Sequence, residues 1–215
     1  MSAPVVSLRA LGVDLGRTPV LRDLDLEVAP GEAVGISGAN GSGKTTLLRV
    51  AATLLTPTTG TAEVLGVDVT SDARFDVRPT IGFIGHTPSL FPHLTLAENT
   101  SFAAELLGAT ISDVSSALAQ VGLSAASSRR ADHCSFGMQR RAEFATLLLA
   151  PPRLLLFDEA QAGLDSGAVE LVDHLLKDVV ARGGGAIVVS HQRAHGGLPL
   201  DRTLELDNGN LEVAA

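Results

Sequence analysis

The residues with the clearest chemistry form a short glycine-rich loop that starts at Gly38 and has the sequence Gly-Ala-Asn-Gly-Ser-Gly-Lys-Thr. The loop fits the pattern G-x-x-x-x-G-K-[ST], in which glycines let consecutive backbone N–H groups point at a phosphate. The apolar run 32–37 before it predicts a buried strand, and residues 46–52 after it predict the first turns of a helix. We therefore predict a phosphate-binding loop (P-loop), although a plain glycine turn that caps a helix is the alternative interpretation.

The side chains of the P-loop predict a site for a nucleotide and its metal ion. Lys44 would reach the β- and γ-phosphates, and the Thr45 hydroxyl would hold Mg²⁺. The helix N-terminus would add partial positive charge beneath the phosphates. The residues expected to bind the nucleotide are Gly38, Ala39, Asn40, Gly41, Ser42, Gly43, Lys44, Thr45 and Thr46.

Two acids follow a second apolar run, residues 154–157. Asp158 could hold Mg²⁺ through its water shell, and Glu159 could act as the general base that polarises the attacking water. Two acids can also mark an ordinary solvated strand end, but the P-loop upstream favours the catalytic interpretation. His191 follows the apolar run 186–189 and could contact the γ-phosphate, with a surface loop histidine as the alternative.

Charge and composition limit the classes of partner. A net charge of −8 over 215 residues argues against nucleic acid as the main ligand. Cys134 is the single cysteine, which excludes an intramolecular disulfide and suits a reducing cytosol. The sequence has neither a signal-peptide pattern nor an apolar run long enough to cross a membrane, so we expect a cytosolic protein. Hydrophobic residues make up 45% of the chain, so surplus apolar surface could dock on another protein.

The remaining patterns predict the elements that must position these residues. Alternation of apolar and polar residues, as at Leu24, Leu26 and Val28 with acids between them, predicts antiparallel strands over 5–15 and 20–28. The P-loop helix would end at 56–60, and Thr95 with Glu98 fits a capping box for a helix to about residue 107. A small strand pair with a turn at Gly66 is expected at 63–69, and further strands are expected at 81–85, 154–157 and 186–189. Helices are expected at 111–121, 135–149 and 167–181, and a hairpin at 203–213.

These elements predict an α/β fold with a mainly parallel central sheet, an antiparallel β flank and a helical insertion. Ligands of such sheets lie at the carboxyl ends of the strands. Gly38, His86, Asp158 and His191 all follow predicted strands, so all four are expected to face one site.

The order of these motifs resembles that of the nucleotide-binding subunits of ATP-binding cassette (ABC) transporters, over nearly the whole chain. The matching segments are the P-loop, the strand before His86, Ser135-Phe136-Gly137-Met138, Leu156-Phe157-Asp158-Glu159, Gly163-Leu164-Asp165 and Ser190-His191. The resemblance implies a P-loop NTPase fold with a RecA-like sheet and one ABC ATPase domain over 1–215. Within it, residues 1–86 and 150–215 would form the β flank and catalytic core, and residues 87–149 the helical subdomain. ATP and Mg²⁺ are the implied ligands.

The resemblance also implies roles for residues outside the P-loop. Ser135 and Gly137 would bind the γ-phosphate of ATP held by a partner subunit, although Ser135 is also a suitable helix N-cap. His191 matches the switch histidine and Asp165 the loop that couples the two sites. Cys134-Ser135-Phe136-Gly137-Met138 stands where the family has its L-S-G-G-Q signature, and Arg141 matches an arginine common just after it.

The chain departs from the family pattern at several positions. His86 stands in place of the Q-loop glutamine, where it would still contact nucleotide, Mg²⁺ and water, but with a pH-sensitive imidazole. Phe136 and Met138 replace a glycine and a glutamine of the signature. Near Leu15, where the family stacks an aromatic ring on adenine, none is present, so we expect weak enforcement of base identity.

The implied function is ATP hydrolysis by a head-to-tail dimer, with itself or with a homologous ATPase subunit, that drives a separate membrane permease. The subunit would be peripheral on the inner face of the cell membrane. Apolar candidates for the docking groove are Leu90, Phe91, Leu94, Leu96 and Phe102, with the core of the insertion as the alternative.

Three functional alternatives remain open. The short chain and Ile84-Gly85-His86 are similar to the haem-exporter ATPases of cytochrome c maturation, and multidrug-type exporters are close behind. A soluble ABC ATPase that acts as an assembly scaffold is a second class. A small P-loop kinase is a third, but it leaves the β flank and the Ser135-Gly137 segment unexplained.

Overall fold

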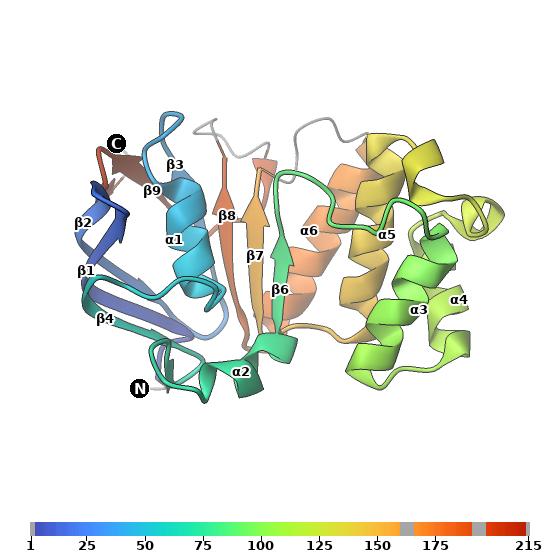
Figure 1. Ribbon diagram of the computed structural model, residues 1–215, viewed down its shortest axis with the longest axis horizontal. Coiled ribbons are helices and arrows are strands. Elements are labelled where there is room, and N and C mark those ends of the chain that lie inside the picture. Colours follow the sequence, from blue (N-terminus) through green and yellow to red (C-terminus); the bar gives the residue numbers. More distant parts are fainter. Residues whose placement is uncertain (1–2, 160–165, 191–196, 214–215) are drawn as a thin grey trace. The chain divides into compact units, whose positions relative to one another are not determined.

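A computed structural model describes residues 3–159, 166–190 and 197–213 (Figure 1). The strands are β1 (Val6–Leu15), β2 (Thr18–Val28), β3 (Glu32–Ser37), β4 (Thr59–Val64), β5 (Val67–Asp68), β6 (Ile81–Ile84), β7 (Leu154–Asp158), β8 (Gly185–Val189), β9 (Arg202–Asp207) and β10 (Asn210–Val213). The helices are α1 (Lys44–Ala51), α2 (Arg74–Val77), α3 (Leu96–Leu107), α4 (Ile111–Gln120), α5 (Phe136–Leu149) and α6 (Ser166–Ala181), with 3₁₀ turns at Arg78–Thr80, Ser124–Ala126 and Ala131–His133. Among the described residues, no helix combines the length and apolar composition needed to cross a bilayer.

The chain divides into two compact units. The first comprises Met1–Phe83, Pro152–Ala160 and Leu175–Ala215, and the second comprises Ile84–Pro151 and Gln161–His174. The P-loop belongs to the first unit, together with Asp158 at the end of β7 and Glu159 directly after it.

A six-stranded sheet carries the P-loop strand, with the strand order β10-β9-β3-β8-β7-β6. β3 pairs in parallel with β8 and β9, and β7 pairs in parallel with β8. Every residue of β7 and β8 is buried, which is the pattern of strands covered on both faces. Because β3 and β7 flank the same strand in the same direction, their carboxyl ends meet at one edge of the sheet.

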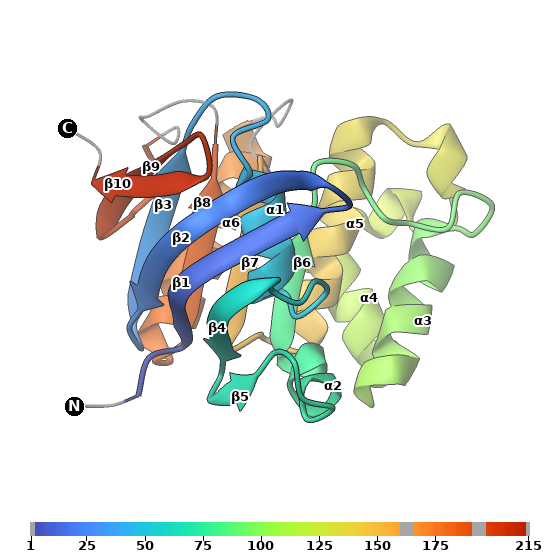
Figure 2. The same cartoon turned by 60° about the vertical axis from the view of Figure 1, so that its left-hand side comes forward.

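A second, four-stranded sheet has the order β2-β1-β4-β5 and is antiparallel throughout (Figure 2). The predicted alternation in β2 is confirmed, because Leu24, Leu26 and Val28 are buried while Asp23 and Asp25 are exposed. Strands of both sheets contact α1, and the buried apolar residues of this helix belong to the core that the two sheets share. The P-loop helix is therefore held on both sides by β-structure.

One predicted boundary was wrong. The P-loop helix ends at Ala51, not at 56–60, and its C-cap is Ala52. Residues from Thr59 onward already belong to β4, which pairs with β1, so the predicted small strand pair is part of the larger antiparallel sheet. Thr53 takes a positive φ of 59° just after the helix, and this left-handed residue turns the chain toward β4.

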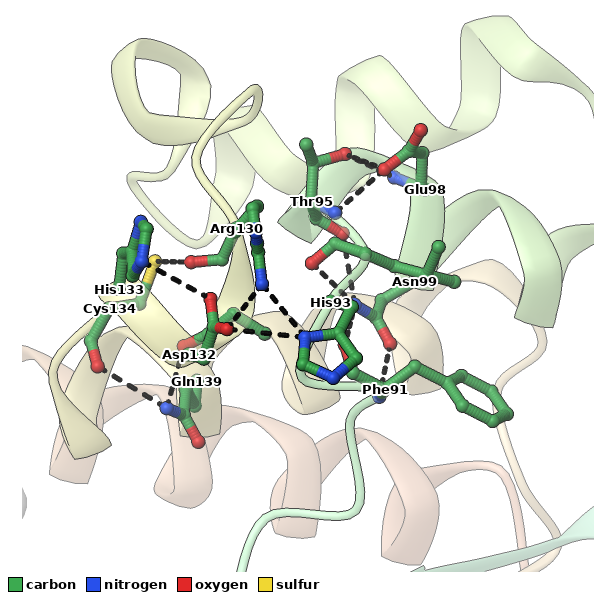
Figure 3. Close-up of polar contacts among 12 residues, drawn as sticks. Phe91, His93, Thr95, Glu98, Asn99, Arg130, Asp132, His133, Cys134 and Gln139 are labelled. Atoms are coloured by element: carbon green, nitrogen blue, oxygen red, sulfur yellow. Dashed lines mark hydrogen bonds and ion pairs between the residues drawn. The ribbon is translucent and has the colours of Figure 1, made fainter.

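The second unit contains a group of helices in which α3, α4 and α5 pack pairwise against one another. The predicted capping box at Thr95 is confirmed: its hydroxyl accepts from the Glu98 N–H at 3.1 Å, and Glu98 accepts the Thr95 N–H at 2.7 Å (Figure 3). The buried Asn99 side chain then accepts from the Phe91 N–H at 2.7 Å and donates back to the Phe91 carbonyl. These contacts fix the start of α3. Together the two units confirm the α/β fold with a mainly parallel sheet, an antiparallel flank and helices.

Candidate functional site

The backbone of the P-loop, between β3 and α1, requires glycine at two positions and leaves a hydroxyl for a ligand. Gly38 has φ 153°, and a Cβ there would lie 2.3 Å from the Leu206 carbonyl oxygen. Gly43 has φ 109°, and its Cβ would lie 2.7 Å from Cδ2 of Leu21. The Ser42 hydroxyl is buried beside Gly38 and has no hydrogen-bond partner among the described residues. A narrow glycine loop with an unmatched hydroxyl at the start of a helix fits an anionic group such as a phosphate.

Lys44 is the cation of this loop. Its Nζ donates to the carbonyl oxygens of Gly38 at 2.7 Å and Ala39 at 2.8 Å, which holds the ammonium group inside the loop. Burial lowers the pKa of Lys44 below its ordinary value of 10.5, while the carboxylates of Glu159 and Asp158 act in the opposite direction. An ammonium group has three donors, and the two carbonyls use two of them.

The predicted metal-binding pair is brought together. Thr45 donates its hydroxyl to Oδ2 of Asp158 at 2.8 Å, and Asp158 is buried at the end of β7. A hydroxyl and a carboxylate are hard oxygen ligands of the kind that Mg²⁺ prefers. The donor set therefore fits the predicted magnesium ion.

Glu159 has an unusual backbone conformation. Its φ is +56°, a left-handed value that glutamate rarely adopts, and its N–H donates to the Val189 carbonyl at 3.0 Å. Such strain concentrates at functional sites, where the surrounding structure holds it. Here the bond to the end of β8 fixes the residue that is predicted to be the general base.

A cavity of about 360 Å³ opens over these residues. It is lined by Val20, Asn40, Gly41, Gly43, Lys44, Thr45, Thr46 and Glu159. The cavity thus gathers the Lys44 and Glu159 side chains with most of the P-loop. Val20, from β2, was missed by sequence reasoning because its alternation with neighbouring residues indicates only a half-buried strand. Leu15, at the position expected for the adenine contact, is exposed over 46% of its surface.

The other predicted nucleotide contacts belong to the second unit. His86 is exposed in the segment after β6, and Ser135 is the exposed N-cap of α5, where its Oγ accepts from the Met138 N–H at 3.3 Å. Gly137 lies in the first turn of α5, with open space where a Cβ would stand. The capping role of Ser135 is therefore established, and nucleotide binding by these three residues stays a prediction.

The segment before Ser135 is held by side chains on both sides (Figure 3). Arg130 forms an ion pair with Asp132 at 2.6 Å, and Gln139, from the first turns of α5, donates to the Cys134 carbonyl at 3.2 Å. Burial acts to raise the pKa of Asp132, but its polar contacts, chiefly with Arg130, lower it by more. The pKa of Asp132 therefore lies below its ordinary value. These bonds fix the chain that delivers Ser135 to the helix.

The apolar docking candidates have different environments. Leu96 is fully buried, so the alternative interpretation holds for it: it belongs to the core of the second unit and not to a groove. Leu90 and Leu94 are partly buried. Phe91 and Phe102 are about half exposed and form an edge-to-face pair with ring centroids 5.3 Å apart.

His191 and Asp165 lie outside the described residues, so their predicted roles remain predictions. Sequence reasoning also missed a buried ion pair on α5 between Arg140 and Glu143. The signal was present, because these opposite charges lie three residues apart within a helix that carries apolar residues on its buried face.

Comparison with known proteins places this geometry in context. A family model described as ABC transporter matches residues 21–162. The cytochrome c biogenesis ATP-binding export protein CcmA of Bradyrhizobium diazoefficiens is 39% identical over 176 residues, which covers 82% of this chain and 86% of that protein. The protein of the same name from Cupriavidus necator is 37% identical over 206 residues, which covers 95% of this chain and 88% of the relative.

Solved structures agree with the fold. The ATP-binding subunit of an ABC transporter is similar with a TM-score of 0.86 at 27% identity, over 98% of this chain and 88% of that one. A dimeric post-hydrolysis state of the ATP-binding cassette MJ0796, bound to ADP and Pi, is similar with a TM-score of 0.85 at 26% identity, over 97% and 98% of the two chains.

Proposed function

Because this chain belongs to the ABC transporter family, as one of its ATP-binding and ATP-hydrolysing subunits, we propose that it powers export through a separate membrane subunit. The exported cargo would be haem or another small molecule used in cytochrome c biogenesis. This assignment is supported by relatives named cytochrome c biogenesis ATP-binding export proteins, which match 82% and 95% of the chain. The subunit would act at the inner face of the cell membrane, bound to the permease.

The observation that carries the hydrolytic part of this proposal is the contact between Thr45 and Asp158, with Lys44 beside it. The P-loop backbone would hold the phosphates of ATP, and Ser42 would donate its unmatched hydroxyl to one of their oxygens. Lys44 would direct its third N–H at the β- and γ-phosphates, where its charge offsets theirs.

Glu159 would hold the attacking water and accept its proton. As the water oxygen bonds to the γ-phosphorus, the bond from that phosphorus to the bridging oxygen breaks and ADP leaves. The position of Glu159 in the cavity that also contains Lys44, and its fixed backbone, support this role. His191 would contact the γ-phosphate.

Thr45, Asp158 and His86 would hold Mg²⁺, His86 through its imidazole. When bound, the metal would neutralise negative charge on the β- and γ-phosphates and thereby favour cleavage of the bond that joins the γ-phosphate to ADP. Thr45 and Asp158 already face each other in the same unit, so both oxygens would be available after a small change of their mutual hydrogen bond.

A second subunit would complete each site. Ser135 and Gly137 of one copy would bind the γ-phosphate of ATP held by the other, with the N-terminus of the 14-residue helix α5 directed at it. ATP would therefore favour the closed dimer, and loss of the γ-phosphate would release it. The partner would be a second copy or a homologous ATPase subunit, and the dimeric structure of the similar cassette MJ0796 with ADP and Pi supports such a pairing.

Co-purification tests the transport assignment. The tagged chain would be isolated from detergent-solubilised membranes of its own cells, and its partners identified by mass spectrometry. An integral membrane permease is the expected partner. Recovery of soluble partners alone would contradict transport and favour the scaffold class. Lys44→Ala is the matched control for the role of ATP, because it should keep the permease but lose hydrolysis.

A further inference from the structure

One buried guanidinium in the second unit contacts two segments that the proposed function assigns to nucleotide. Arg140 lies one helical turn after Phe136 on α5, and only 1% of its side chain is exposed. Its guanidinium carbon lies 5.2 Å from the centre of the ring of Phe136, which is a residue of the signature segment. Its Nη2 donates to the main-chain carbonyl of His86 at 2.8 Å. A single side chain therefore joins the start of α5 to the segment after β6.

The partner of Arg140 makes a second connection between the same two segments. Glu143 accepts from Nη1 of Arg140 at 2.7 Å, and 6% of its side chain is exposed. Its other carboxylate oxygen accepts both the N–H and the hydroxyl of Ser89, at 2.7 and 2.9 Å. The ion pair thus holds the segment from His86 to Ser89 at both ends.

Stability alone does not account for this arrangement. A buried ion pair is often no more stabilising than well-packed apolar residues of similar volume, because both charges lose their hydration. Burial lowers the pKa of Arg140 and raises that of Glu143, which shows the cost to each charged form. Nε of Arg140 is also buried without an acceptor in the described part of the chain. A planar guanidinium holds its hydrogen-bond partners at fixed angles, and apolar residues could not orient those partners in this way.

We propose that Arg140 and Glu143 are positioning residues that couple the signature segment Ser135–Gly137 to His86. The inference rests on the proposed function, in which Ser135 reaches ATP across the dimer and His86 contacts the metal and water. A displacement of either segment would be transmitted through the guanidinium to the other. ATP bound by the signature of one subunit would therefore adjust His86 in that same subunit.

The test separates positioning from stability with an apolar replacement of the whole pair. Arg140→Met combined with Glu143→Leu removes both charges together, so the variant should keep a wild-type melting temperature. We expect its KM for ATP to stay within about threefold while kcat falls by about 10- to 100-fold, because reacting groups are misplaced. Wild-type kcat in a folded double variant would overturn the proposal. The exposed pair Arg9–Glu27, changed to Arg9→Gln with Glu27→Gln, is the control.

If the double variant does not fold, two other experiments test the proposal. One uses a conservative variant of Arg140, and the other leaves Arg140 and Glu143 unchanged. Arg140→Lys keeps the charge but not the planar fork, so kcat should fall with the melting temperature preserved; unchanged kcat would overturn the proposal.

The second experiment uses Glu159→Gln, which should bind ATP but not hydrolyse it. In this variant, ATP should slow hydrogen exchange at the Ser89 and Met138 amides together. Slowing of one amide without the other would contradict the coupling.

Failure of the inference is distinguishable from failure of the proposed function. If the wild-type protein hydrolyses no ATP, or if Lys44→Ala hydrolyses it at the wild-type rate, the proposed function fails. If wild-type hydrolysis depends on Lys44 but is indifferent to Arg140 and Glu143, only the coupling is wrong.

Discussion

Thr45 and Asp158 are separated by 113 residues, yet the hydroxyl of the first donates to the carboxylate of the second at 2.8 Å. The contact arises because β3 and β7 both pair in parallel with β8, so the residues that follow them lie at one edge of the sheet. It places a hydroxyl and a carboxylate, both oxygen ligands of the kind that Mg²⁺ prefers, beside the cation Lys44.

Removal of the Thr45 hydroxyl should weaken the metal site. Thr45→Val keeps the shape of the side chain but lacks the oxygen, so we expect the Mg²⁺ concentration for half-maximal hydrolysis to rise by about 10- to 100-fold. Thr45→Ser retains the hydroxyl and should stay close to wild type. Titration of ATP hydrolysis with MgCl₂ measures both variants, and an unchanged Mg²⁺ requirement in Thr45→Val would remove Thr45 from the metal site.

Replacement of Glu159 should separate binding from turnover. Glu159→Gln keeps the size of the side chain but cannot accept the proton of water, so kcat should fall by about 10²- to 10⁴-fold. The dissociation constant for ATP should stay within about threefold, and an ATP-bound dimer should accumulate in size-exclusion chromatography with Mg²⁺.

The matched control for that variant is Glu63→Gln, which changes an exposed carboxylate of β4. It should leave both binding and turnover at wild-type values. Wild-type turnover in Glu159→Gln would instead show that another group accepts the proton.

Much of the site could be predicted because its signals are local. The P-loop, the capping box at Thr95 and the apolar run that ends at Asp158 each depend on residues within one short segment. The end of the P-loop helix could not be predicted, because β4 competes for the chain by pairing with β1. The full burial of Leu96 and of the Arg140–Glu143 pair could not be predicted either, since burial depends on contacts with distant segments of the second unit, although the spacing of the two charges was a local signal for their pairing.

The capping box at Thr95 predicts a specific dependence of stability on pH. Hydrogen bonds from the Thr95 N–H and hydroxyl lower the pKa of Glu98 below its ordinary value of 4.5. The folded state therefore favours the carboxylate: this stabilisation is complete above pH 4.5 and is lost as the pH falls through the lower folded-state pKa.

At about pH 7, Glu98→Gln should accordingly unfold at a lower urea concentration than wild type. At about pH 3.5, the difference between the two unfolding midpoints should be smaller. Glu105→Gln, on the exposed face of the same helix, should show no such convergence. If the difference in unfolding midpoint between Glu98→Gln and wild type stayed constant with pH, a role for the charge of Glu98 would be contradicted.

Calorimetric titration of ATP into wild type and Lys44→Ala tests the central claim, that the P-loop grips the phosphates, most directly. Lysine at position 44 supplies the charge inside the loop, so the dissociation constant of the folded variant should rise by at least about tenfold. Lys177→Ala removes the chain's other lysine, on α6, and should bind ATP as wild type does. Equal affinity of wild type and folded Lys44→Ala would contradict the account.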